Sequence, residues 1–217
     1  MVWHVTLGED YDAAREGFDW SFPEGFNAAH DLVEIHDDLD RPALYQAYPD
    51  GRRETYTFAA LDRLSNRLAN GLTDRGVSRG DRVAVVCPQR PENLLTHLAC
   101  WKLGAVSVPL SVLFGPDALS YRLADSGASA VVADPQVSGT VAEVAAGLDS
   151  PPRVVEATDG RLEVAGTPTE GAEPFADLLV DDDAFELADT DHETPAVILY
   201  TSGSTGPPKG VRHGHGV

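Results

Sequence analysis

Residues 81–110, DRVAVVCPQRPENLLTHLACWKLGAVSVPL, decide the fold class of this 217-residue chain. The runs 81–87 and 105–110 are apolar without alternation, which is typical of strands covered on both faces. Between them, residues 91–103 predict a helix that begins at a proline. A strand, a helix and a second strand in this order predict two parallel strands joined by a crossover helix. We therefore expect an α/β protein with a mostly parallel sheet and covering helices.

The segments on both sides extend this pattern. On the N-terminal side, residues 42–58 predict a hairpin that turns at Pro49-Asp50-Gly51. Residues 58–75 then predict a helix, capped by Thr57 and ended by Gly76, whose leucines recur at helical spacing. On the C-terminal side, the predicted elements are a helix at 117–126, a strand at 128–133, a helix at 139–148 and a strand at 153–156.

The first 25 residues show no regular period and predict an N-terminal arm that lies on another surface. Four aromatic residues are expected to anchor it: Trp3, Phe18, Trp20 and Phe22. Residues 26–217 are expected to form one domain that starts with a short helix at 26–35. The otherwise irregular stretch at 136–194, strongly acidic at 181–193, is interpreted as an excursion of that domain rather than a linker.

Acidic residues outnumber basic ones by 35 to 16, which gives a net charge of −19. Such a surface repels phosphate backbones and anionic lipid headgroups, so we expect neither nucleic acid nor a membrane surface as a partner. The acids are 22 Asp and 13 Glu, and the bases are 14 Arg and two Lys, Lys102 and Lys209. An Asp-rich, Lys-poor composition is typical of a protein adapted to concentrated salt, and the alternative is an ordinary acidic protein. Because lysine is so rare in this chain, we expect each lysine to have a specific role.

The compartment is predicted from cysteines and from the N-terminus. Cys87 and Cys100 lie in apolar stretches and predict buried thiols rather than a disulfide. The N-terminus carries acids where a signal peptide carries bases, and no apolar run approaches the roughly 18 residues of a membrane span. We expect a soluble, cytoplasmic protein without a membrane span.

Residues 195–211, PAVILYTSGSTGPPKGV, carry the chemistry. They predict a buried strand at 196–200 that runs into a loop with four hydroxyl side chains, three glycines and one lysine. Hydroxyl donors, inward-facing backbone N–H groups and a cation suit a polyphosphate. The loop is not a Walker A loop, because Pro208 precedes Lys209 and Gly210 follows it, and it contains no G-x-S-x-G nucleophile elbow. The structural alternative is a flexible Gly/Ser turn.

The order TSGSTGPPKG at 201–210 resembles the phosphate-binding signature of the adenylate-forming superfamily, which includes acyl-CoA synthetases, luciferases and peptide-synthetase adenylation domains. TYTFAAL at 55–61 and WKLGAVSVPL at 101–110 are similar to two structural motifs of this family. The opening, with Phe26-Asn27, resembles acyl-CoA synthetases of the medium-chain and acetyl-CoA type. The resemblance covers nearly all of this chain but less than half of a family member.

This resemblance implies the fold of the N-terminal part of the large adenylating domain, with residues 26–217 as an incomplete AMP-binding domain. It implies an AMP-forming reaction in which a fatty or short- to medium-chain carboxylate, ATP and coenzyme A give acyl-CoA, AMP and pyrophosphate, with Mg²⁺ accompanying ATP. Lys209 would steady the departing pyrophosphate or anchor the loop. The residues implied to wrap the phosphates are Thr201, Ser202, Gly203, Ser204, Thr205 and Gly206. No catalytic residue and no metal ligand is assigned within the chain.

Two classes of function follow. In the first, the chain is an acyl-CoA ligase that takes a small carboxylic acid and is completed by a second polypeptide. In the second, it is a catalytically silent remnant or a module that binds nucleotide or a partner. Other candidate residues carry less weight. We expect His213 and His215 in a loop or helix start rather than at a metal, and His97 as a packed or solvated side chain. The acidic run at 181–183 is interpreted as a solvated face.

Overall fold

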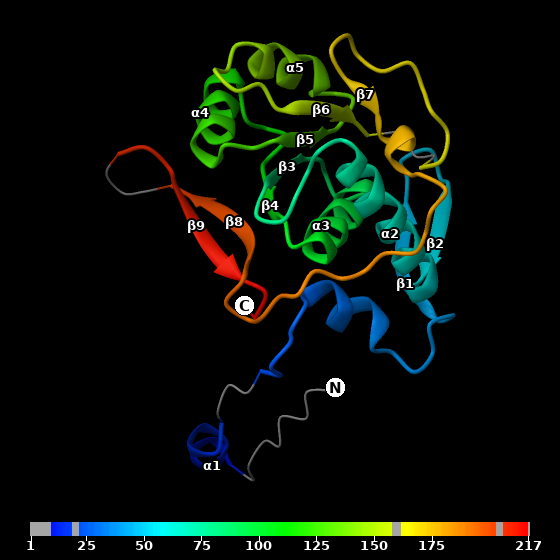
Figure 1. Cartoon of the computed structure of the whole chain (residues 1–217), viewed down its shortest axis with the longest axis vertical. Helices are drawn as coiled ribbons and strands as arrows, with labels where there is room; N and C mark the ends of the chain where they lie inside the picture. The colour runs from blue at the N-terminus through cyan, green and yellow to red at the C-terminus, as the bar shows by residue number, and fades with distance from the viewer. Residues whose placement is uncertain (1–9, 19–21, 158–161, 203–205, 217) are drawn as a thin grey trace.

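The computed structural model describes residues 10–18, 22–157, 162–202 and 206–216, and its centre is a seven-stranded sheet (Figure 1). The strands are β3 (Arg82–Val86), β4 (Val106–Pro109), β5 (Ala130–Ala133), β6 (Arg153–Glu156), β7 (Glu173–Pro174), β8 (Pro195–Thr201) and β9 (Lys209–Gly214). They lie in the order β7-β6-β5-β3-β4-β8-β9. Strands β3 to β8 are parallel and β9 is antiparallel to β8. The predicted α/β class with a mostly parallel sheet is confirmed.

Helices cover both faces of this sheet. The remaining elements are α1 (Tyr11–Glu16), the π-helix η1 (His30–Glu34), the hairpin β1 (Pro42–Ala47) and β2 (Arg53–Thr57), α2 (Phe58–Asp74), α3 (Pro91–Leu103), α4 (Pro116–Ser126), α5 (Ser138–Ala146) and the 3-10 helix η2 (Phe175–Leu178). Helices α2 and α3 pack on one face, and α4 and α5 on the other (Figure 1). None of the described helices is long and apolar enough to span a membrane.

Strand β3 explains why the central runs are apolar without alternation. Val83 and Val85 are buried in the cluster on the α2–α3 side, whereas Ala84 and Val86 are buried in the cluster on the α4–α5 side. Successive side chains of a strand point to opposite faces, and both faces are covered here. Apolar burial on both sides therefore holds the three layers together.

Helix α2 forms as predicted because its ends are capped and one face is apolar. The Ala60 N–H donates to Thr57 Oγ1 at 3.1 Å. Gly76, with a φ of 87°, follows the C-cap and ends the helix. The buried leucines of this helix are Leu61, Leu64, Leu68 and Leu72. The predicted hairpin before it is also confirmed, because β1 pairs with β2 in antiparallel register.

Lys102, in the last turn of α3, is fully buried. Its Nζ donates to Asn66 Oδ1 at 2.6 Å and to a carboxylate oxygen of Asp62, both on α2. It also lies 3.3 Å from Glu34 Oε1 of η1. Lys102 thus links three helical elements through one buried charge. The second lysine, Lys209, is exposed. The predicted buried thiols are confirmed as well: Cys87 and Cys100.

The described part of the N-terminal segment has a regular element that the sequence did not predict. It contains α1, which begins at the N-cap Asp10 and buries none of its residues. Phe22 stacks on His192, with ring centroids 4.6 Å apart, and meets Phe26 edge-on at 5.6 Å. Phe18 is 43% exposed. Two predicted anchors lie outside the described residues: Trp3 and Trp20.

The stretch at 136–194 contains two elements that the sequence did not predict, β7 and η2. Strand β7 pairs in parallel with β6 and so extends the central sheet. Arg67 of α2 donates to the carbonyls of Leu179 and Val180 at 2.8 and 2.6 Å. These contacts attach the stretch to the sheet and to α2. Near the N-terminus, the helix expected at 26–35 is present, with its central residues in the π-helix η1.

The C-terminal hairpin differs from the prediction of a buried strand. Of the residues of β8, Ala196 alone is buried. Ile198 and Tyr200 pack partly against the α4–α5 cluster. On the opposite face, Leu199 is 42% exposed and its cross-strand neighbour Val211 is 40% exposed. The prediction was wrong because β8 lies beside the edge strand β9, where the described helices do not cover both faces.

Candidate phosphate-binding site

The predicted phosphate loop, residues 201–209, joins β8 to β9 at the carboxyl end of β8. The hairpin register pairs Thr201 with Lys209, so the first hydroxyl and the cation of the loop come from its two stems. Both residues are exposed, and so are Ser202 and Gly206. The other predicted phosphate ligands lie outside the described residues: Gly203, Ser204 and Thr205.

Two positions in the loop are occupied by glycine for different structural reasons. Gly206 has a φ of 102°, a left-handed conformation that side chains disfavour. Gly210 lies on β9, where a Cβ would approach Ile198 Cγ2 to 2.9 Å and Tyr200 Cζ to 3.3 Å. Close packing against β8 therefore explains why residue 210 is a glycine. The sequence had suggested a different reason, the close approach of the backbone to a ligand.

The polar groups on the hairpin suit an anion. Thr201 and Ser202 offer hydroxyl donors, Lys209 offers an ammonium group, and Arg212 adds a second exposed cation on β9. These cations stand out in a chain whose net charge is −19. In open α/β sheets, ligands bind beyond the carboxyl ends of the parallel strands, and this is where the loop leaves β8. Lys209 and Arg212 are three residues apart on β9 and so point to opposite faces. The arrangement can therefore bind a polyphosphate through hydrogen bonds and an ion pair with Lys209.

The two histidines near the C-terminus have different surroundings. His213 lies on β9, and the buried His215 follows it and accepts a hydrogen bond from the Ala28 N–H at Nδ1, 3.1 Å away. The expected loop or helix start is wrong at His213, because this residue pairs with Val197 of β8, and it is confirmed at His215, which lies in the turn after β9. Burial lowers the pKa of His97 and of His215 to about 4. Among the described residues, no group of three or more His, Cys, Asp or Glu side chains could hold a metal ion.

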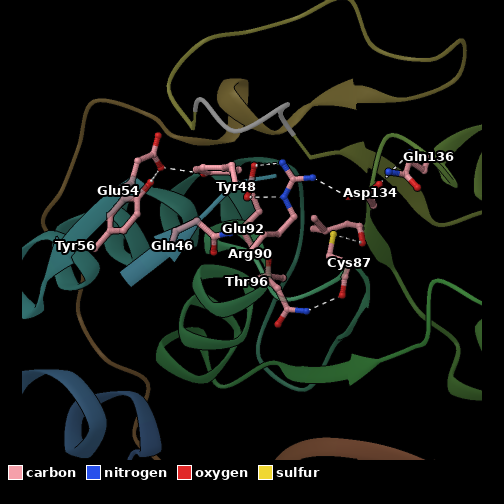
Figure 2. A network of polar contacts seen from close by, with 12 residues as sticks. Gln46, Tyr48, Glu54, Tyr56, Cys87, Arg90, Glu92, Thr96, Asp134 and Gln136 are labelled. Atoms are coloured by element: carbon pink, nitrogen blue, oxygen red, sulfur yellow. Dashed lines mark hydrogen bonds and ion pairs between the residues drawn. The ribbon is translucent and has the colours of Figure 1, made fainter. Parts of the chain in front are cut away.

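A buried charge network lies at the carboxyl ends of β3 and β5 (Figure 2). Arg90 donates to both carboxylate oxygens of Glu92, at 2.9 and 3.2 Å, and to Asp134 Oδ2 at 2.7 Å. Burial by itself lowers the pKa of the Arg90 guanidinium, but Glu92 and Asp134 outweigh burial and raise it. Sequence reasoning missed this network, whose signal is an Arg-Pro-Glu triplet at the start of a helix. It joins the chain that follows β3 to the chain that follows β5.

Two cavities of the described part of the molecule lie away from the loop. One, of about 590 Å³, is lined in part by Arg52 of the hairpin and Glu156 of β6. The other, of about 390 Å³, is more apolar and is lined in part by Phe22, Trp101 and His215. Among the described residues of the loop, 201–202 and 206–209, none lines either cavity. The exposed residues of the loop include Thr201, Ser202, Gly206 and Lys209.

Known proteins resemble this chain in sequence. The family model described as "AMP-binding enzyme" matches residues 34–217. The mouse mitochondrial acyl-coenzyme A synthetase ACSM3 is 29% identical over 95% of this chain and 36% of its own length. A feruloyl-CoA synthase from an Amycolatopsis species is 40% identical over 74% of this chain and 28% of its own length.

The fold is similar to that of solved acyl-CoA synthetases. The crystal structure of the Brucella canis acyl-CoA synthetase matches with a TM-score of 0.80 and 30% identity, over 93% of this chain and 37% of that one. The chain thus spans between 28% and 37% of the length of these three proteins. Because the family model covers most of the chain, and the likeness extends to sequence and fold, the chain belongs to the AMP-binding enzymes of the adenylate-forming superfamily.

Proposed function

We propose that this chain carries the phosphate-binding part of an AMP-forming acyl-CoA synthetase. In the first step, a carboxylate oxygen attacks the α-phosphorus of ATP, acyl-adenylate forms and pyrophosphate leaves. In the second step, the thiol of coenzyme A attacks the acyl carbon, the thioester forms and AMP leaves. The substrate class is a small carboxylic acid. The proposal rests on the family match and on the residues of the loop.

The pairing of Thr201 with Lys209 is the observation that carries the proposal. Negative charge develops on the pyrophosphate as it leaves, so donors that are already in place there lower the barrier. Thr201, Ser202 and Lys209 are exposed at the end of a parallel strand, where the β- and γ-phosphates can reach them. Gly203, Ser204 and Thr205 complete the proposed ligand set.

Mg²⁺ would be held by the phosphates of ATP and by water, a common arrangement for this ion in enzymes that use nucleotides. The chain spans about a third of its relatives' length. In this proposal, a second polypeptide supplies the remaining elements of the family. The carboxylate and coenzyme A would then bind between the two.

Replacing Lys209 with alanine tests the role of the loop. We expect Lys209→Ala to lower carboxylate-dependent exchange of labelled pyrophosphate into ATP by about 100-fold, because a cation at the developing charge is lost. The assay uses Mg²⁺, high KCl and carboxylates of two to ten carbons. Arg63→Ala, which removes an exposed cation on α2, is the matched control and should leave the exchange rate unchanged.

The assay has two arms. The chain is measured alone and together with a polypeptide that carries the rest of the family's length. Exchange that needs the second polypeptide and is reduced by Lys209→Ala would support a split ligase. No exchange in either arm would contradict the proposed reaction and favour a catalytically silent remnant. Equal losses in Lys209→Ala and Arg63→Ala would contradict the role of the loop.

We also propose that the protein works in a salt-rich cytoplasm, because its net charge of −19 opposes compact folding until salt screens it. We expect the melting temperature to rise by about 5 °C between 0.1 and 2 M KCl, which corresponds to about 2 kcal/mol of screened repulsion. Sucrose of equal osmolality is the control for solvent exclusion. A melting temperature that is unchanged or lower in 2 M KCl would contradict the proposal.

A further inference from the structure

Helix α4 holds both stems of the phosphate loop. Tyr200, the second-last residue of β8, donates to Asp125 Oδ2 at 2.7 Å. Tyr121 donates to the carbonyl of Pro208, at 2.9 Å, directly before β9 and Lys209. The two tyrosine rings meet edge to face with centroids 6.5 Å apart. One helix therefore contacts the chain just before the loop and just before its lysine.

A buried arginine of α4 packs against the ring of Tyr200 and supports these contacts. Arg122 is 9% exposed, and its guanidinium carbon lies 4.1 Å from the ring centroid of Phe114 and 5.6 Å from that of Tyr200. Its Nη1 donates to the Ala118 carbonyl at 2.8 Å. Cation–π contact with two rings stabilises the charge and limits where the Tyr200 ring can lie. The β8 stem is thereby packed onto α4 as well as hydrogen-bonded to it.

We propose that Tyr121 is a positioning residue for the phosphate loop: through the Pro208 carbonyl it fixes where β9, and hence Lys209, begins. This inference rests on the proposed function, because it assigns Lys209 to ATP. Tyr200 plays the matching part at the other stem. Its pKa is raised by burial and by the Asp125 carboxylate, so its hydroxyl stays protonated and remains a donor at neutral pH. With both stems held, ATP binding orders less of the chain and costs less entropy.

Hydrogen exchange without nucleotide tests the contact itself. In Tyr121→Phe, the Pro208 carbonyl loses its donor, and we expect the amides at 206 and 209–213 to exchange about threefold to tenfold faster, as for one lost hydrogen bond. Tyr45→Phe is the matched control, because Tyr45 is 74% exposed and should leave these amides unchanged. Exchange in Tyr121→Phe equal to that of the unmodified chain would overturn the inference.

Binding of Mg²⁺–ATP, measured by calorimetry on the same variants, tests positioning. We expect Tyr121→Phe to weaken binding about threefold to tenfold while the melting temperature changes by less than about 2 °C. If the amide hydrogens of Tyr121→Phe exchange faster but its affinity for ATP is unchanged, the positioning role is overturned. If the unmodified chain binds no ATP, alone or with the second polypeptide, the proposed function fails. In that case, the hydrogen-exchange experiment still decides whether Tyr121 holds the β9 stem.

Discussion

Arg90→Met is expected to lower the free energy of unfolding by about 3–5 kcal/mol, the usual cost of removing one partner from a buried ion pair. Glu92 is fully buried and Asp134 is 10% exposed at its side chain, so water cannot replace the lost guanidinium. Arg90 forms three hydrogen bonds to these two carboxylates. The variant keeps an apolar side chain of similar length, so the loss reports on the charge rather than on a cavity.

Urea unfolding of the variant and the unmodified chain gives this free-energy difference. Arg63→Met is the matched control, because Arg63 is exposed on α2 and its loss should change stability by less than about 0.5 kcal/mol. The Arg90→Met effect should persist in 2 M KCl, since a buried pair is screened little. A loss no larger than that of Arg63→Met would show that the network contributes nothing to stability.

Gly71→Ala is expected to destabilise the protein by about 3 kcal/mol or more through overpacking. Gly71 lies inside α2, and a Cβ there would come within 1.9 Å of the Leu178 carbonyl oxygen and 2.7 Å of its carbon. The obstacle is backbone, so no rotamer change relieves it and η2 must move away from α2. Helix propensity alone predicts the opposite sign, a gain of about 1 kcal/mol for alanine over glycine.

The sign of this change is read from thermal unfolding of the purified variant. Gly25→Ala serves as its control, because a Cβ at Gly25 meets nothing within 4 Å. We expect the control to stay within about 0.5 kcal/mol of the unmodified chain. A Gly71→Ala variant that is as stable as the unmodified chain, or more stable, would refute the close approach of η2 to α2.

Much of the fold could be predicted because its signals are local. The leucine spacing of 58–75, the Thr57 cap and the proline at the start of 91–103 lie within the elements they specify, and those helices form with these bounds or nearly so. The predictions failed where an element depends on contacts with another segment of the chain rather than on its own sequence. Strand β9 carries little apolar pattern of its own and forms by pairing with β8.

The candidate site also has a part that the sequence predicted and a part that it could not predict. The order of residues at 201–210 was enough to indicate a polyphosphate and the family, because that chemistry resides in one short segment. Its supports could not be predicted, because Tyr121 and Pro208 are 87 residues apart. The buried link between Lys102 and Asp62 spans 40 residues.

The sequence by itself determined the class of fold and most helices and strands, and it predicts the residues of the phosphate loop. Hydrophobic period, capping residues and turn residues act between near neighbours in the chain. Only the tertiary structure decided that Lys102 is buried and Lys209 exposed, that β8 is half-covered, and that α4 contacts Tyr200 and Pro208. These properties depend on burial and on contacts between distant segments, which chain folding brings together and no local pattern records.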